Sequence, residues 1–508
     1  MALLALLGAC THPVAVGWQE RDSHGGGEPH ASRPTSPSPT RTSPSTDVGH
    51  PDSLTAEQLR AALATLGDTA PAGKLALRAA RLAHHRGDDA EARALLARTA
   101  TAADAADVAP AAAALGRELA APPVSPSTIA VLLPLSGRFA AIGSELRAAV
   151  ELAPREGTSW LFLDTRGDPD GAAAAVEQAY ARGAVGILGP AGTREAIAAA
   201  RAASLRGLPI ALLAPDDGAS PAAGVFRLAS SPGDEARAVA RMALADNFPT
   251  VAVFAPRDDV GEEAADAFVA EATALGLAVT AHGTYDPTGG DLEPDLKKFL
   301  NLVPATNPRL ADHLAHGGKK AWSTFSPDVP YSLLYIPDRY DRAALVAAFL
   351  PYYNVELRTT EFPDLRILQR KHGGHMPQVV QLVGGAGWHH PSLPIRGGDA
   401  VQGALIVDTW AAEQGADAAQ QFAAAFQGRA GRAASSVAAE AYDAATLVAQ
   451  VRATIAMAPD PRGALRVALA HARLEDGACG PAAIGVDGEL VREATVLEVQ
   501  GSDLVVAP

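Results

Sequence analysis

The sequence predicts an α/β fold, preceded by a small all-α domain. From residue 128 onwards, short apolar segments alternate with longer segments in which apolar residues recur every three or four positions. This alternation is typical of βαβ units and a parallel sheet. Residues 54–121 instead carry helical periodicity throughout, and a Pro-rich segment at 121–127 separates the two regions. We therefore expect at least two folded domains, as the length of 508 residues also suggests.

The clearest strand is the continuous apolar run Ile129–Leu133, which stops at Pro134. A run of this kind is expected to be buried on both faces of a parallel sheet. The same pattern predicts further strands at 159–163, 184–188, 209–213, 225–228 and 250–254. Helices are expected between them at 140–153, 170–182, 193–206, 233–246 and 261–276. Near the C-terminus, Asp487-Gly488 predicts a hairpin turn.

The helical region at 54–121 carries its own start and stop signals. Thr55 and Asp88 suit helix N-caps, and Gly67 and Gly87 suit helix C-termini. Residues 76–98 resemble a tetratricopeptide hairpin, in which small residues let two helices approach closely. We expect a small helical domain that packs on its neighbour or a partner, with a simple helical stalk as the alternative.

The first 53 residues predict a targeting segment and a tether. The tetrapeptide Leu7-Gly8-Ala9-Cys10 is typical of a lipobox, so residues 1–10 are expected to be a lipoprotein signal peptide and Cys10 its lipidation site. The alternative is an ordinary apolar N-terminal segment. Residues 11–53 are rich in Pro, Ser, Thr and Gly and predict a disordered tether.

Composition excludes several classes of function. The net charge of −15 argues against nucleic acid or an anionic membrane surface as a general partner, since both are polyanions. The sequence has no phosphate-binding loop, dinucleotide fingerprint, nucleophile elbow or zinc-protease helix. The histidine pairs at 372 and 375 and at 389 and 390 lack metal-site spacing. We therefore expect no enzyme activity, no cofactor and no metal.

Two turns follow predicted strands and open helices. The first holds Ser136, Gly137, Arg138 and Phe139, and the second holds Gly189, Pro190 and Thr193. Ligands of open α/β sheets bind at this edge, where loop amides and helix N-termini converge. The amides and the Thr193 hydroxyl are therefore candidates to hold a carboxylate, while the alternative is that Thr193 simply caps its helix.

These residues also carry a resemblance. The strand, the Pro-Leu-Ser-Gly turn at 134–137 and the Gly143-x-x-x-Arg147 helix look like the opening of the type I periplasmic-binding-protein fold. A later stretch resembles penicillin-binding protein activators, which are outer-membrane lipoproteins of Gram-negative bacteria. That stretch contains Ile336-Pro337-Asp338, then Leu382, Gly384, Gly387 and Trp388, then Val401-x-Gly403.

The resemblance implies one bilobal domain over 128–508, in which two Rossmann-like lobes are joined by three crossovers. Lobe 1 would comprise about 128–247 and 405–480, and lobe 2 about 248–404 and 481–508. It also implies that Thr193, Asp216, Ser220, Asp338 and Trp388 belong to the ligand cleft. Asp216 and its neighbour Asp217 would suit a cationic group or form a solvated turn.

Two functions follow from the resemblance. The first is a non-enzymatic activator of a peptidoglycan synthase, held by Cys10 on the periplasmic face of the outer membrane. The alternative is a periplasmic receptor that binds an amino acid or similar solute for an ABC transporter or a sensor. The two can coexist if a cell-wall fragment in the cleft changes partner binding.

Overall fold

The computed structural model describes residues 50–120, 122–215, 218–359, 364–372, 374–414 and 417–507. These residues form two compact units, which divide after residue 120. The lipobox with Cys10, residues 11–49 of the expected tether and Asp216 lie outside the described residues. The last part of the expected tether is described, and there Pro51–Ser53 form a 3₁₀ turn that leads into the first helix.

The first unit is helical, as the sequence predicts. Its helices are α1 (Ala56–Leu66), α2 (Ala72–His85), α3 (Asp89–Thr99) and α4 (Ala105–Ala120). The expected caps are confirmed, because Thr55 forms a capping box with Gln58 and the Asp88 side chain accepts from the Glu91 amide. Helix α2 packs on α1 and on α3, and the buried residues include Leu59, Leu63 and Leu75.

The first sheet of the second unit is parallel, in the order β2-β1-β3-β4-β5. Its strands are β1 (Ser125–Leu133), β2 (Ser159–Asp164), β3 (Ala184–Leu188), β4 (Ile210–Leu212) and β5 (Val225–Arg227). Its helices are α5 (Ala140–Leu152), α6 (Pro169–Ala181), α7 (Thr193–Arg206), α17 (Ser436–Thr454) and α18 (Pro461–Leu469).

Both faces of this sheet are covered. Ile129, Val131 and Leu133 pack with α5, α17 and α18 on one face, whereas Ala130 and Leu132 pack with α6 and α7 on the other. All five residues are fully buried, which confirms the expectation for this apolar run. Alternating side chains of one strand thus supply two separate cores.

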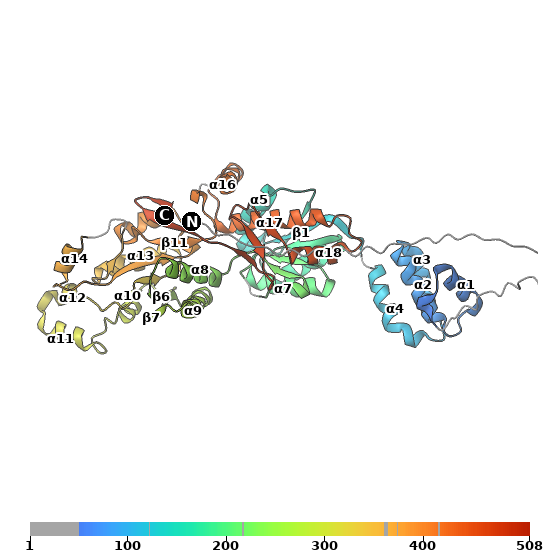
Figure 1. The fold of residues 1–508 in the computed structure, drawn as a ribbon, viewed down its shortest axis with the longest axis horizontal. Coiled ribbons are helices and arrows are strands. Elements are labelled where there is room, and N and C mark those ends of the chain that lie inside the picture. The colour runs from blue at the N-terminus through green and yellow to red at the C-terminus, as the bar shows by residue number, and fades with distance from the viewer. Residues whose placement is uncertain are drawn as a thin grey trace, which may run out of the picture. The chain divides into compact units, whose positions relative to one another are not determined.

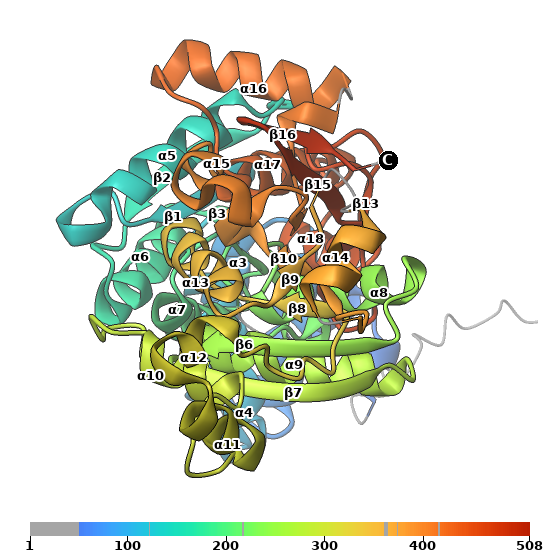
Figure 2. The same ribbon diagram turned by 90° about the vertical axis from the view of Figure 1, so that its left-hand side faces the viewer.

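The second sheet has the order β16-β15-β11-β10-β8-β6-β7, with β9 paired to β10. Its strands are β6 (Thr250–Pro256), β7 (Ala278–Tyr285), β8 (Leu333–Tyr335), β9 (Glu356–Leu357), β10 (Val379–Gly384), β11 (Leu405–Asp408), β15 (Thr495–Gln500) and β16 (Asp503–Val506). Strands β15 and β16 are antiparallel to their neighbours. Figure 1 shows this sheet and its helices as a lobe distinct from the first, and Figure 2 views the molecule from the side on which this lobe lies.

The helices of this lobe are α8 (Pro232–Ala245), α9 (Asp259–Ala274), α10 (Glu293–Phe299), α11 (Pro308–His316), α12 (Ala321–Thr324), α13 (Tyr340–Tyr352), α14 (Leu365–Lys371) and α15 (Ser392–Gly397). Helices α8 and α9 cover one face, and α10, α13 and α15 cover the other. Helix α16 (Asp417–Ala430) instead packs against α5 through Phe422 and Phe426. In Figure 1 it stands apart from both sheets.

Three chain crossings join the lobes, at Leu228–Ser231, at Thr409–Ala411 and at Glu493–Ala494. We expected the first crossing near residue 247, but α8 packs on α9 and β11 and so belongs to the second lobe. Likewise β11 pairs with β10, so the second crossing follows residue 408 rather than 405. Before the third crossing, β13 (Ala482–Ile484) and β14 (Leu490–Arg492) form the hairpin predicted at Asp487-Gly488, beside β12 (Arg473–Leu474).

Candidate functional site

The predicted loops of lobe 1 lie at one edge of its sheet. Ser136, Gly137, Arg138 and Phe139 follow β1, and Gly189, Pro190 and Thr193 follow β3, which is the neighbouring parallel strand. Ser136, Gly137, Arg138 and Thr193 are exposed, Phe139 is half-buried, and Gly189 and Pro190 are buried. The Arg138 guanidinium lies 4.4 Å from the centre of the Phe139 ring.

The amides after β1 already have an acceptor within the chain. Asp164, the last residue of β2, accepts from the Leu135 amide at 2.9 Å, the Ser136 amide at 3.2 Å and the Ser136 hydroxyl at 2.6 Å. Although partial burial works to raise it, these hydrogen bonds and that of the Arg166 amide hold the pKa of Asp164 below its usual range. The amides of this turn are therefore not free for a ligand carboxylate in the way the sequence suggested.

The turn after β3 also differs from expectation in detail. Gly192 is the N-cap of α7 and Thr193 its first residue, so Thr193 does not cap the helix. Two residues on, the nearly buried Glu195 accepts a hydrogen bond from the Thr165 hydroxyl, and burial raises the pKa of Glu195. A side chain at Gly192 would collide with this carboxylate. The Thr193 hydroxyl itself stays exposed at the helix start.

The predicted cleft residues of lobe 2, Asp338 and Trp388, follow the neighbouring strands β8 and β10 but differ in exposure. Asp338 follows β8, accepts from the Tyr285 hydroxyl at 2.5 Å and has its pKa raised by burial. Trp388 follows β10 and is fully buried, with its indole Nε1 donating to the Ile336 carbonyl at 3.0 Å. The expectation that Trp388 lines the cleft is therefore wrong for its side chain, which packs over Gly384 in the core. Ser220, which belongs to lobe 1, is half-buried and forms an isolated antiparallel β-bridge with Val225.

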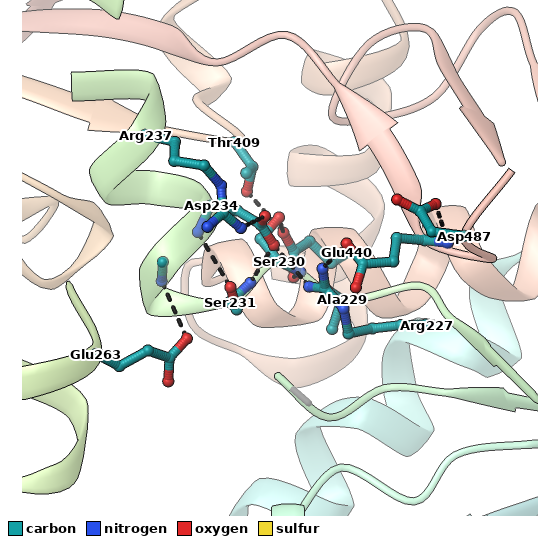
Figure 3. Close-up of polar contacts among 12 residues, drawn as sticks. Arg227, Ala229, Ser230, Ser231, Asp234, Arg237, Glu263, Thr409, Glu440 and Asp487 are labelled. Atoms are coloured by element: carbon teal, nitrogen blue, oxygen red, sulfur yellow. Dashed lines mark hydrogen bonds and ion pairs between the residues drawn. The ribbon is translucent and has the colours of Figure 1, made fainter. Parts of the chain in front are cut away.

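A dense polar network at the crossings was missed by the sequence analysis (Figure 3). Glu440 of α17 accepts from the Ser230 hydroxyl at 2.6 Å in the first crossing and from the Thr409 hydroxyl at 2.9 Å in the second. Arg227, at the end of β5, pairs with Asp234 at 2.6 Å and with Glu489 at 2.5 Å. The sequence signal for such residues is a charge inside an apolar pattern, as at Arg227.

The third crossing joins the same network. Arg492, at the end of β14, contacts Asp443 of α17 at 3.3 Å, and both side chains are buried. Asp443 also accepts from the Ala478 amide at 2.6 Å and the Cys479 amide at 2.9 Å. Each of the three crossings is therefore fixed to α17 through a buried carboxylate.

Two more titratable groups lie beside the crossings. The His389 Nδ1 lies 2.6 Å from Asp408, which also accepts from the Ser436 hydroxyl at 2.6 Å. Burial opposes the shift, but hydrogen bonds to Asp408 and Glu413 raise the pKa of His389 to about 9. Glu235 of α8 accepts from the Ala386 amide at 3.0 Å, and burial, together with the charges of Asp408 and Glu440, raises its pKa to about 8.

Two cavities flank these elements. One, of about 350 Å³, lies at the crossings and is lined by α8, β11 and the segment around β14. The other, of about 760 Å³, is an open groove between α5 and α16, where Arg429 and Arg432 pair with Glu151 and Glu145. Of the predicted cleft residues that the structure describes, none lines either cavity.

In the described ranges, no group of three or more His, Cys, Asp or Glu side chains is placed to hold a metal ion. No helix within those ranges combines the length and apolar character that a membrane crossing requires. The described Cys479 is a buried free thiol.

The fold is similar to several solved structures. A putative branched-chain amino acid ABC transporter protein from Rhodospirillum rubrum is 20% identical with a TM-score of 0.58, and the match covers 75% of this chain and 99% of that one. An ABC transporter substrate-binding protein from Sphaerobacter thermophilus is 17% identical with a TM-score of 0.56, over 76% and 97% of the two chains.

A third similar structure is a branched-chain amino acid transporter substrate-binding protein from Streptococcus pneumoniae in complex with isoleucine. It is 16% identical with a TM-score of 0.50, over 75% of this chain and 99% of that chain. No curated protein matches the sequence at a significant level. The family model described as periplasmic binding protein matches residues 126–306 and 367–503, which is more than half of the sequence. The chain therefore belongs to the periplasmic binding protein family.

Proposed function

We propose that the protein is a non-enzymatic receptor that binds a small carboxylate-bearing solute between its lobes and serves an ABC transporter or a sensor. The observation that carries this proposal is the pair of α/β lobes joined by three crossings, with exposed polar groups at the strand ends of lobe 1. Ligands of such folds bind at that edge, and closure of the lobes then excludes water.

Two side chains of lobe 1 supply the hydrogen-bond donors that bind the solute carboxylate. Because Asp164 already engages the amides of Leu135 and Ser136, we assign recognition of the solute carboxylate to the Arg138 guanidinium and the Thr193 hydroxyl. Both are exposed and follow neighbouring strands. A carboxylate ligand agrees with the isoleucine named for the Streptococcus pneumoniae structure and with the 3,4-dihydroxybenzoic acid named for a Rhodopseudomonas palustris solute-binding protein.

Thermal unfolding of the full chain against a panel of amino acids, hydroxybenzoates and cell-wall peptides tests this proposal. A ligand at 100 times its dissociation constant is expected to add about 2.7 kcal/mol to the free energy of unfolding. Arg138→Ala and Thr193→Ala should each remove much of that gain. Arg201→Ala, an exposed arginine further along α7, is the matched control. A panel without any stabilising member would contradict the receptor function.

A second candidate is an activator of a peptidoglycan synthase. The observation that favours it is the helical unit of α1–α4, which lies outside the residues matched by the family model. Helical hairpins of this kind commonly bind other proteins. We further propose that Cys10 is acylated and anchors the protein on the periplasmic face of the outer membrane, with a cell-wall fragment as the alternative cleft ligand.

The second candidate predicts that the full chain binds a purified penicillin-binding synthase at micromolar concentration and changes its transpeptidase rate. If binding is absent, the activator function fails, while the receptor function is untouched. Incorporation of labelled palmitate into the wild type, but not into Cys10→Ser, tests the anchor separately.

A further inference from the structure

The open groove between α5 and α16, which we call the α5–α16 groove, has a volume of about 760 Å³. Figures 1 and 2 show α16 next to α5, the helix it packs against. The charged residues of the lining are Arg147, Arg429, Arg432, Glu145 and Glu151, and the other lining residues are alanines and one serine. The volume falls within the range of about 300–1,000 Å³ that ligand sites occupy.

The two glutamates of the lining hold the three arginines in place. Glu151 accepts from Arg147 Nε at 2.9 Å and also pairs with Arg429. Glu145 accepts from the hydroxyl of the α17 N-cap at 2.6 Å and pairs with Arg432 at 2.7 Å. The Glu151 and Glu145 side chains are 16% and 15% exposed, whereas the three arginine side chains are each about half exposed. The charges that a ligand in the groove can reach are therefore those of the arginines.

The groove carries a surplus of positive charge in a chain whose net charge is −15. Its three guanidinium groups and two carboxylates leave one positive charge in excess. Among the described residues, the arginines contact the glutamates through one nitrogen each, which is Nε in Arg147 and Nη2 in Arg429 and Arg432. A guanidinium has five N–H donors, so donors remain on the exposed part of each side chain. Such donors bind carboxylates through strong, charge-assisted hydrogen bonds.

The positive charge is concentrated at two positions along α5. One arginine lies at Glu145 and two lie at Glu151, and these glutamates are six residues apart. Because an α-helix rises 1.5 Å per residue, the two positions are separated by about 9 Å along the helix axis. Ala148 lies between them on α5, and Ala430 lies between the arginines of the opposite wall. These small side chains leave room for a peptide backbone between the two positions.

This separation matches the repeat of a polyproline II helix. That conformation has three residues per turn and rises about 3.1 Å per residue. Side chains three residues apart therefore lie on the same face, about 9 Å from each other. A peptide in this conformation with acidic residues at such a spacing presents one carboxylate to each arginine position.

We infer that the α5–α16 groove binds an acidic segment of a partner protein, in polyproline II conformation, whose carboxylates are three residues apart. One carboxylate binds Arg432, and the other binds Arg147 and Arg429. A small anion reaches only one of the two positions and binds more weakly. The groove is thus a protein-docking surface of lobe 1, and the inference does not depend on whether a solute binds between the lobes.

Fluorescence anisotropy of the rhodamine-labelled hexapeptide PEPPEP, titrated with the full chain, tests this inference. Its prolines favour the polyproline II conformation and place the two glutamates three residues apart. We expect saturable binding that weakens as the salt concentration rises. PEEPPP has the same composition but adjacent carboxylates, and PQPPQP has none. Both should bind at least tenfold more weakly than PEPPEP, and inorganic phosphate should compete far less than unlabelled PEPPEP.

Variants of the full chain locate the binding. Arg147→Gln and Arg432→Gln each remove one guanidinium and should weaken PEPPEP binding about tenfold. Arg201→Gln, at an exposed arginine of α7, should leave it unchanged. Because the arginine variants also break ion pairs, Ser144 provides an independent position, as an exposed residue of the groove lining. Ser144→Glu adds a negative charge and should weaken binding, whereas Ser144→Gln, similar in size but uncharged, should weaken it much less.

Four results would each overturn the inference. The first is an absence of PEPPEP binding, and the second is equal binding of PEEPPP or PQPPQP. The third is binding that survives both Arg432→Gln and Ser144→Glu. The fourth is competition by inorganic phosphate as strong as that by unlabelled PEPPEP, which would assign the groove to small anions instead.

Discussion

Glu440 and Asp443 lie three residues apart on α17 and together hold all three chain crossings. Glu440 binds Ser230 of the first crossing and Thr409 of the second, and Asp443 binds Arg492 just before the third. Residues at this spacing share one helix face. That face of α17 is therefore the point at which the connections between the lobes converge, and we expect substitutions there to affect both stability and lobe motion.

Glu440→Ala tests this role directly. The substitution leaves the Ser230 and Thr409 hydroxyls without their acceptor, and a buried polar group without a partner costs about 1–3 kcal/mol. We expect a loss of that size in the free energy of unfolding, measured by urea denaturation. Glu262→Ala, an exposed glutamate on α9, should cost less than about 0.5 kcal/mol. Equal losses in the two variants would contradict the role of Glu440.

Glu235 is expected to make stability fall as pH rises. Burial, then the charges of Asp408 and Glu440, raises its folded-state pKa to about 8, above the ordinary value of 4.5. A raised pKa gives a contribution that is fully present below about pH 4.5 and is lost by about pH 8. Glu235→Gln cannot ionise and still accepts from the Ala386 amide. It should match the wild type near pH 4.5 and exceed it by a few kcal/mol at pH 8, as measured by urea unfolding across that range.

The contribution of His389 to the free energy of unfolding should be lost at higher pH than that of Glu235. With its pKa raised to about 9, its contribution is complete below about pH 6.5 and is lost as pH rises through 9. The full effect is about 3 kcal/mol. In a Glu235→Gln background, which removes the decline assigned to Glu235, His389→Asn should flatten the remaining decline between pH 6.5 and 9, while His375→Asn, at an exposed histidine, should leave that curve unchanged. A decline that persists in the Glu235→Gln, His389→Asn double variant would assign it to another group.

The sequence was sufficient for most of the scaffold. The run Ile129–Leu133 predicted a buried strand because a short continuous apolar run that stops at a proline is typical of one, and all five residues are buried. Local signals also worked at Thr55 and at Asp487-Gly488, where capping and turn chemistry involve near neighbours. The sequence analysis named no helix in the segment 307–330, which contains α11 and α12; Asn307 caps α11 and Pro308 is its first residue.

The site was harder to predict because its contacts join residues distant in sequence. Arg227 forms an ion pair with Glu489, and the Ser230 hydroxyl donates to Glu440. The members of each pair lie far apart in the sequence, and neither pair forms a local sequence motif. The turn after β1 illustrates the same difficulty, since its amides were visible in the sequence while their acceptor, Asp164, lies on a different strand. A charged residue within an apolar segment indicates burial and a partner, but it does not identify the partner.

Substitutions of Trp388 distinguish a structural role of this side chain from a role in ligand binding. Its indole is fully buried against Gly384 and donates to the Ile336 carbonyl, so removing it leaves a large cavity and an unpaired carbonyl. Trp388→Ala is expected to cost about 3–5 kcal/mol in urea unfolding. Trp388→Phe keeps most of the volume but loses the hydrogen bond and should cost less. Trp322→Ala, at an indole that is 43% exposed, should cost under about 1 kcal/mol. If Trp388→Ala instead leaves stability intact and changes only solute binding, Trp388 contacts the ligand after all, and the loop after β10 must open in solution.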